Sequence, residues 1–156
     1  MGYIQTMIIR DATLNDAPDL LRMGELMHHE SPRFNKFTFD LDKTGKLIEF
    51  LVTNDNGIVI VAEHDGKLIG MLGGMVTEHF FSRDTYACDF VVFIDPEYRG
   101  GSTVIRMIKL FEQRAKDLGA KEVSLGISTE VNTERTASLY EKLGYMRSSI
   151  GTIKRI

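Results

Sequence analysis

The chain has 156 residues, of which 43% are apolar, and its 19 Lys and Arg against 22 Asp and Glu give a formal net charge of −3. This length and apolar content suit one hydrophobic core, so we expect residues 1–156 to form a single domain. The balanced charge argues against nucleic acid and anionic membrane as general partners, because both call for a concentrated basic surface. The single Cys excludes an internal disulfide, and no apolar run approaches the roughly 20 residues of a membrane span, so we expect a soluble, cytoplasmic protein.

The amino-terminal third is predicted to hold a short strand and two helices. The apolar run at residues 7–9 predicts the strand. From Ala17 the apolar residues recur at helical spacing, and this helix must end before Pro32 because a proline disfavours helical geometry in the residue that precedes it. A second helix is predicted over residues 41–52, ahead of a polar turn. Residues 31–40 lie between the helices, carry three Phe without clean periodicity, and are predicted to form a loop.

The middle of the chain is rich in β-branched residues and predicts strands. Residues 58–62 and 68–72 flank a short turn that contains Asp65 and Gly66, which is typical of a β-hairpin. A further strand is predicted over residues 85–94, because the proline that follows cannot donate to a central sheet.

The strongest helical pattern follows two glycines and covers residues 104–118, where apolar residues fall at steps of four and three. A strand over 123–127, a helix over 136–143 and a last strand over 145–153 complete the chain. Together the elements predict an α/β (α+β) fold with a mixed, mostly antiparallel twisted sheet of six to seven strands, flanked by about four helices.

The glycine turn that leads from strand 85–94 into helix 104–118 is a candidate anion site. Gly100 and Gly101 allow successive N–H groups to converge on an anion at the start of a helix, where unpaired donors and the helix dipole favour negative charge. Arg99 would add charge-assisted hydrogen bonds. The alternative is that the glycines merely turn the chain while Ser102 or Thr103 caps the helix. Neither a GxxxxGK[ST] loop nor a GxGxxG loop is present.

Two segments together resemble the Gcn5-related N-acetyltransferase (GNAT) family: IDPEYRGG at residues 94–101 and LYEKLGY at residues 139–145. The resemblance runs from the opening at residues 8–13 to the end of the predicted sheet. It implies the acyl-CoA N-acyltransferase fold, in which a fourth strand (85–94) and a fifth strand (121–128) splay apart. Members of the family bind acetyl-CoA in the resulting V.

The resemblance also implies which residues hold acetyl-CoA. Main-chain groups of Val92, Phe93 and Ile94 would pair with the pantetheine arm, and the pyrophosphate would lie on the segment formed by Arg99, Gly100, Gly101, Ser102, Thr103 and Val104. Val104 adds bulk where the family has Gly or Ala, so affinity for the cofactor depends on how this side chain lies. Asn132 stands one residue earlier than the family's Asn, and it either reaches the cofactor arm or caps the helix that follows.

For the chemistry, the resemblance points to Tyr140 as the donor of a proton to the departing thiolate, since a phenol with a pKa near 10 stays protonated at neutral pH. Its alternative role is that of a packed core aromatic. Asp89 is the first candidate for the general base, and Glu78 and His79 are others. A lone Asp in such a strand is also often only a hydrogen-bonded edge residue.

The sequence therefore predicts an N-acetyltransferase that moves an acetyl group from acetyl-CoA to a primary amine by direct transfer in a ternary complex. The acceptor would be a small molecule or a peptide, no metal is expected because adjacent His28 and His29 point apart on a helix, and a homodimer is possible. The alternative is a non-catalytic acyl-CoA-binding or regulatory domain, and a protein-interaction domain on a reused fold is a third hypothesis.

Overall fold

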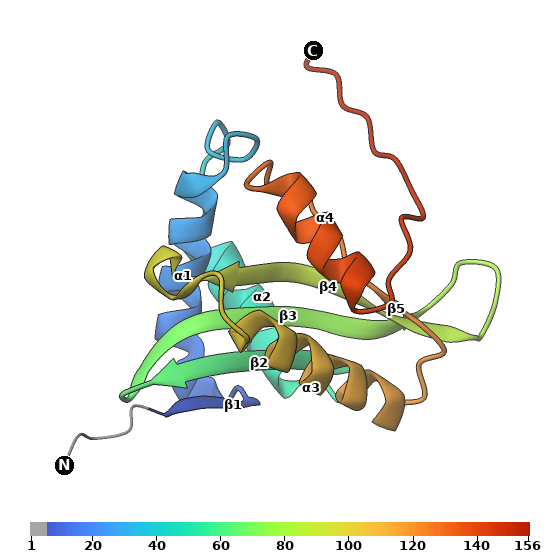
Figure 1. Cartoon of the computed structure of the whole chain (residues 1–156), viewed down its shortest axis with the longest axis horizontal. Helices are drawn as coiled ribbons and strands as arrows, with labels where there is room; N and C mark the ends of the chain where they lie inside the picture. The colour runs from blue at the N-terminus through green and yellow to red at the C-terminus, as the bar shows by residue number, and fades with distance from the viewer. Residues whose placement is uncertain (1–5) are drawn as a thin grey trace.

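A computed structural model describes residues 6–156, so residues 1–5 of the predicted single domain lie outside the described part. The described residues form five strands and four α-helices, which Figure 1 labels along the chain. In chain order they are β1 (Met7–Asp11), α1 (Ala17–Glu30), α2 (Leu41–Thr53), β2 (Gly57–His64), β3 (Lys67–Glu78), β4 (Thr85–Ile94), α3 (Thr103–Asp117), β5 (Val123–Ser124) and α4 (Thr133–Lys142), with 3₁₀ turns η1 (Leu14–Asp16) and η2 (Pro96–Tyr98).

The strands form one sheet in the order β1-β2-β3-β4-β5, with antiparallel neighbours except for the parallel pair β4 and β5. The predicted hairpin is β2–β3. Its turn places Asp65 at φ 50° and Gly66 at φ 75°, the left-handed conformation that short hairpin turns require. The mixed, mostly antiparallel fold class is confirmed, with five strands in the described chain where six to seven were expected.

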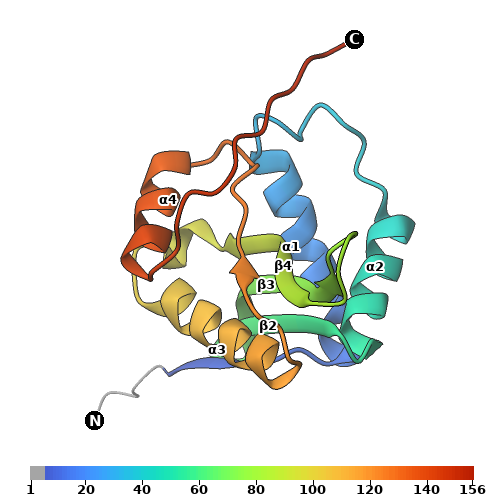
Figure 2. The ribbon, with the colours of Figure 1, turned by 90° about the vertical axis from the view of Figure 1, so that its right-hand side faces the viewer.

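Helices cover both faces of the sheet, as Figure 2 shows, with α1 and α2 on one side and α3 on the other. On the α3 side the predicted helical spacing is confirmed, because Met107, Ile108 and Phe111 are fully buried against the strands. On the opposite side, Met23 of α1 is fully buried in a cluster that includes Phe93 of β4. The sheet is thus fixed from both faces, which holds β4 in place. No helix in residues 6–156 combines the length and the apolar character that crossing a membrane requires.

The predicted last strand over residues 145–153 is wrong. The Tyr145 hydroxyl donates a hydrogen bond to Glu112 at 3.1 Å, but the chain beyond it runs away from the body without strand pairing (Figure 1). Met146 is 87% exposed and Ile150 is 95% exposed. A β-branched segment becomes a strand only when it finds an edge to pair with, and this tail pairs with no edge in the described part of the chain.

Other boundaries also differ from those predicted. Strand β3 covers Lys67–Glu78 and so continues well past the predicted end at residue 72. The fifth strand covers only Val123–Ser124 instead of residues 123–127, because its neighbour β4 diverges from it. Helix α4 begins at Thr133 rather than at Thr136, since Asn132 in the left-handed conformation (φ 49°) starts the helix earlier.

Candidate active site

Strands β4 and β5 part after two residue pairs. The pairs are Ala87 with Val123 and Cys88 with Ser124. Directly beyond them, the Asp89 carboxylate accepts a hydrogen bond of 2.8 Å from the Gly126 N–H, so a side chain spans the gap that main-chain bonds leave. An irregularity in the β3–β4 register leaves Phe90 as an extra residue in β4, and such a bulge bends its strand. The splay that the resemblance implied is therefore present.

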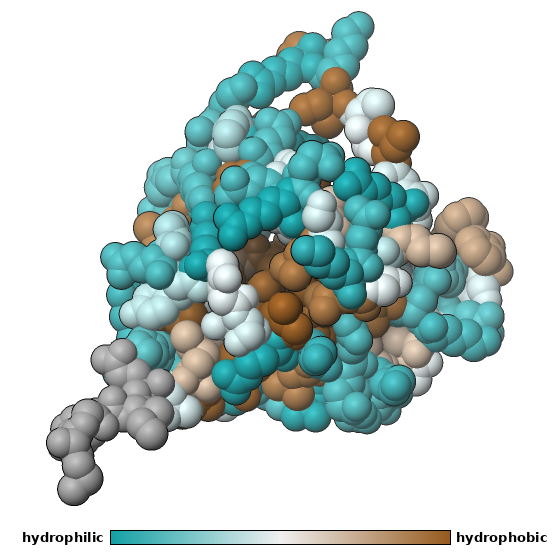
Figure 3. All heavy atoms as spheres, in the orientation of Figure 1, coloured by the Kyte–Doolittle hydropathy of each residue, from teal (hydrophilic) through white to brown (hydrophobic). Residues whose placement is uncertain are grey.

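A pocket of about 770 Å³ opens where the strands part. Its walls come from β4, the glycine turn, the loop after β5, helix α4 and the end of α1. Figure 3 shows a hollow near the middle of one face, with hydrophobic atoms around its lower side. The sequence-predicted residues that line the pocket are Asp89, Val92, Phe93, Ile94, Arg99, Gly100, Gly101, Val104, Asn132 and Tyr140. Ser102 and Thr103 do not line it.

The glycine turn lines this pocket with Gly100 and Gly101 and carries free N–H donors. Gly100 has φ 91°, a conformation that favours glycine, and a Cβ added to Gly101 would stand in open space. The main-chain N–H groups of residues 100–105 have no acceptor within the described residues. Ser102 occupies the N-cap position of α3, but its side chain makes no capping bond. The turn therefore has the donor set of an anion site rather than a closed helix cap.

Arg99 is already engaged by the protein. Its Nε donates to the Ile94 carbonyl at 2.7 Å, and its two terminal nitrogens donate to both carboxylate oxygens of Glu30 at 2.5 and 2.7 Å. This pairing lowers the pKa of the Glu30 carboxyl below its usual range. Sequence reasoning missed Glu30, because a single acidic residue at a helix end carries no signal of a partner far along the chain. The ion pair joins the end of α1 to the glycine turn.

Tyr140 lies in the pocket wall with its ring buried, at 5% exposure. Burial raises the pKa of the Tyr140 phenol well above its ordinary value, and the nearby charge of Asp89 adds to this rise. The hydroxyl makes no hydrogen bond to any residue from 6 to 156. Tyr140 is therefore a protonated phenol whose hydrogen is available to a ligand. Its ring also packs in the hydrophobic core, as the alternative interpretation predicts.

Asp89 lies in the same pocket. Burial raises the pKa of the Asp89 carboxyl, while the hydrogen bond from Gly126 acts in the opposite direction and is the smaller effect. A carboxylate with a raised pKa is a better proton acceptor than an ordinary surface Asp. The structure thus brings both sequence-predicted catalytic candidates to one pocket.

The other base candidates lie elsewhere. Glu78 and His79 stand at the tip of the β3–β4 hairpin and do not line the pocket. The His79 ring stacks on Tyr86, with 4.4 Å between ring centroids. Burial raises the pKa of the Cys88 thiol, which keeps this side chain in its unreactive form.

Two residues of the α4 segment complete the pocket. Asn132 holds the N-cap position, yet its side chain makes no capping bond and is exposed. Arg135 lines the pocket too, and sequence reasoning missed it because a single basic residue on a polar helix is usually only a solvated charge.

Val104 is half-buried and packs partly against the core below α3. No group of three or more His, Cys, Asp or Glu side chains that could hold a metal ion occurs within residues 6–156.

The fold and the cleft between diverging strands define an acyl-CoA N-acyltransferase architecture. Residues 23–145 match the model of the Acetyltransferase (GNAT) family, so the chain belongs to that family, as its sequence indicated. It is an acetyl-CoA-dependent N-acetyltransferase. The chain matches no curated protein in sequence.

Several solved structures share the fold. An aminoglycoside acetyltransferase from an uncultured soil metagenomic sample, solved with sisomicin, has a TM-score of 0.71 at 18% identity over 96% of each chain. The aminoglycoside N-acetyltransferase AAC(6')-Iy, solved with CoA, has a TM-score of 0.76 at 16% identity over 100% of this chain and 98% of that chain. A ribosomal-protein-alanine N-acetyltransferase from Brucella melitensis biovar Abortus has a TM-score of 0.71 at 14% identity over 97% and 99%. At these identities the likeness shows the fold alone.

Proposed function

We propose that this chain transfers the acetyl group of acetyl-CoA directly to a primary amine in a ternary complex, with Tyr140 as the proton donor. The observation that carries the proposal is the Tyr140 hydroxyl, which is protonated and makes no hydrogen bond within the described chain. Tyr140 lines the same pocket as Gly100 and Gly101 of the glycine turn, whose N–H groups also have no acceptor in the described residues. A phosphate-binding turn and a proton donor in one pocket are what acyl transfer from a thioester carrier requires.

The residues present fit acetyl-CoA. The N–H groups of residues 100–105 would hold the pyrophosphate, and the open edge of β4 at residues 92–94 would pair with the pantetheine amides. Asn132 lines the same pocket and its side chain makes no capping bond, which supports a contact with the cofactor arm. Bound there, acetyl-CoA supplies an acetyl group activated as a thioester.

Two residues of the chain then transfer the protons that the reaction requires. Asp89 takes a proton from the amine, directly or through a water molecule, as the nitrogen bonds to the acetyl carbon. Tyr140 gives its phenolic proton to the sulfur as the carbon–sulfur bond breaks. The products are an amide and a free thiol, and the proton on Asp89 returns through solvent to the Tyr140 oxygen.

The acceptor is proposed to be a small-molecule amine. The Ser31 hydroxyl donates to the Thr129 carbonyl at 2.7 Å, which joins the end of α1 to the loop after β5. Phe34, in the same loop after α1, lines the pocket. These contacts hold the segment after α1 against the loop after β5 at the pocket wall, which supports a compact acceptor, in keeping with the aminoglycoside acetyltransferases among the structural neighbours.

The test follows release of free thiol from acetyl-CoA in the presence of an amine panel. The panel holds aminoglycosides including sisomicin, polyamines, free amino acids and a peptide with amino-terminal alanine. We expect thiol release that depends on one small amine and on Tyr140. Release with the peptide alone would replace the proposed acceptor by a protein. Tight binding of acetyl-CoA without turnover on any amine would favour the non-catalytic acyl-CoA-binding domain instead.

A further inference from the structure

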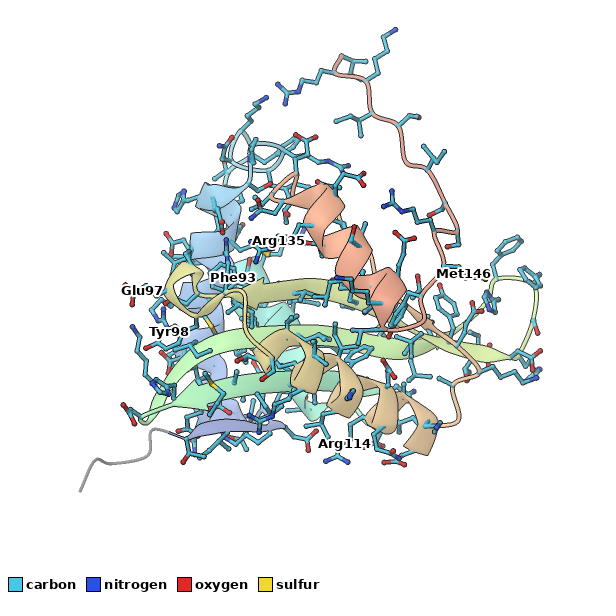
Figure 4. All side chains as sticks on the ribbon, viewed as in Figure 1. Phe93, Glu97, Tyr98, Arg114, Arg135 and Met146 are labelled. Atoms are coloured by element: carbon cyan, nitrogen blue, oxygen red, sulfur yellow. The ribbon has the colours of Figure 1, made fainter. Side chains whose placement is uncertain are left out.

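Arg135 stands beside the glycine turn with its charge uncompensated. Its Nη2 lies 3.3 Å from the position that a Cβ on Gly100 would take, and Figure 4 shows the side chain reaching from α4 toward the turn above Phe93. Within the part of the chain that the structure describes, it makes no hydrogen bond or ion pair. By contrast, Arg147, in the segment that follows α4, pairs with Glu134 and Glu141 of that helix.

The other arginine at the turn is neutralised. Arg99 has a bidentate ion pair with Glu30 and donates to the Ile94 carbonyl, so its donors and its charge are directed at protein groups. Freeing Arg99 for a phosphate would leave Glu30 with an unpaired, partly buried carboxylate, which is costly. The cation that a phosphate meets without breaking an existing pair is therefore Arg135.

We propose that Arg135 donates charge-assisted hydrogen bonds to the pyrophosphate of acyl-CoA held on the glycine turn, and that Arg99 positions the turn against α1 through Glu30. The inference rests on the proposed function, since it needs acyl-CoA in this pocket. It gives the pyrophosphate a side-chain cation on α4, the helix that also carries Tyr140. Binding of the carrier thus fixes the helix that presents the proton donor.

Calorimetric titration of variants with CoA and two of its truncated forms tests the proposal. The ligands are CoA, dephospho-CoA, which keeps the pyrophosphate, and pantetheine, which lacks all phosphates. Arg135→Gln should raise the Kd of CoA and of dephospho-CoA alike by about tenfold, the effect of losing an exposed charge-assisted hydrogen bond. It should leave the Kd of pantetheine unchanged. Arg135→Lys should recover part of the loss because it keeps the charge.

The matched control is Arg83→Gln, which removes another exposed arginine that makes no hydrogen bond or ion pair in residues 6–156 and lies outside the pocket. It should change none of the three Kd values. The pyrophosphate assignment is overturned if the Arg135→Gln variant binds CoA as tightly as the unaltered protein does. It is also overturned if the variant has a higher Kd for CoA but an unchanged Kd for dephospho-CoA. In both cases the proposed function stands. If the unaltered protein binds no CoA, the proposed function fails, and this inference fails with it.

Glu30→Gln tests the role given to Arg99. The variant frees the Arg99 guanidinium without removing it. Under the proposal Arg99 is a positioning residue, so loss of its tie to α1 should weaken CoA binding, and the double variant with Arg99→Gln should be no worse than either single variant. A Glu30→Gln protein that binds CoA several-fold more tightly would make Arg99 the phosphate ligand and overturn the assignment to Arg135.

Discussion

The Oδ1 atom of Asp89 accepts a hydrogen bond of 2.8 Å from the Gly126 N–H, directly beyond the last main-chain pair of β4 and β5. A carboxylate is longer than a main-chain carbonyl, so this bond links the strands while it keeps them apart. It satisfies a donor that the splay would otherwise leave open. The same side chain is the only carboxylate that β4 contributes to the pocket wall. Asp89 therefore has a structural role, the bond to Gly126, and a proposed chemical role as the base.

Asparagine and alanine substitutions separate the two roles of Asp89. Asp89→Asn keeps an oxygen for the Gly126 N–H, so the cleft and the CoA affinity should survive, while kcat falls by roughly 100-fold through loss of the base. Asp89→Ala should lose CoA affinity as well. Both parameters come from thiol-release kinetics and calorimetry, with Asp42→Asn on the exposed face of α2 as the matched control. If Asp89→Asn keeps full kcat, Asp89 is a spacer only.

The raised pKa of the Asp89 carboxyl predicts a pH-dependent cost to stability. Because burial raises its folded pKa above the ordinary value of about 3.9, the ionised form is disfavoured in the folded state, and stability is lost as pH rises through the folded pKa. Asp89→Asn should therefore unfold at a higher temperature than the unaltered protein at pH 7 and at the same temperature below about pH 3.5. A lower melting temperature at pH 7 would show that the Gly126 bond outweighs burial.

Tyr140→Phe removes the proposed acid and little else. The Tyr140 hydroxyl bonds to no group in residues 6–156, so the variant should keep its melting temperature and CoA affinity, while kcat falls by roughly 100-fold. Tyr145→Phe is the control, because that hydroxyl donates to Glu112 outside the pocket. It should cost about 1 kcal/mol of stability and leave kcat unchanged. Equal kcat for both variants would remove Tyr140 from the mechanism.

The two glycines of the turn should respond differently to alanine. Gly100→Ala forces a side chain onto φ 91° and should cost about 1–2 kcal/mol of stability along with CoA affinity. Gly101→Ala has open space for its Cβ and should leave the melting temperature unchanged. It should still lower the affinity for CoA, because the added methyl group lies among the N–H donors of the glycine turn. Thermal unfolding with and without CoA measures both effects. Unchanged CoA protection in Gly101→Ala would contradict this description of the turn.

Part of the loss of stability at low pH should come from Asp16. Arg10 donates to both oxygens of this carboxylate at 2.8 and 2.9 Å, and the Thr13 N–H adds a third bond. These bonds lower the pKa of the Asp16 carboxyl, so its contribution is present above about pH 4 and is lost as pH falls through the lower folded pKa. Asp16→Asn should cost about 2 kcal/mol at pH 7, with the difference vanishing in acid. A pH-independent difference would exclude the ion pair as its cause.

Much of the fold followed from local patterns in the sequence. Helix α3 was set by apolar spacing, and the β2–β3 hairpin was set by the turn at Asp65 and Gly66. Strand β4 was predicted with the bounds it has, because a proline closes it. These features depend on neighbours within a few residues. The tail over residues 145–153 was predicted wrongly, because a strand needs a paired edge and the local sequence does not reveal whether one is available.

The site was only partly readable in the same way. The glycine turn and the segment around Tyr140 have sequence signals of their own. The pairing of Arg99 with Glu30 does not, because it joins residues that only the packing of α1 brings together. For the same reason Arg135 could not be recognised from the sequence, since only the fold brings its guanidinium next to Gly100.

On the proposed function, acetyl-CoA binds in the cleft where β4 and β5 part. Titration of CoA into isotope-labelled protein, followed by amide NMR signals, tests it most directly. We expect the largest chemical-shift changes at residues 92–94 and 100–105, with smaller ones on α4. Absence of binding, or shifts gathered on a face away from this cleft, would contradict it.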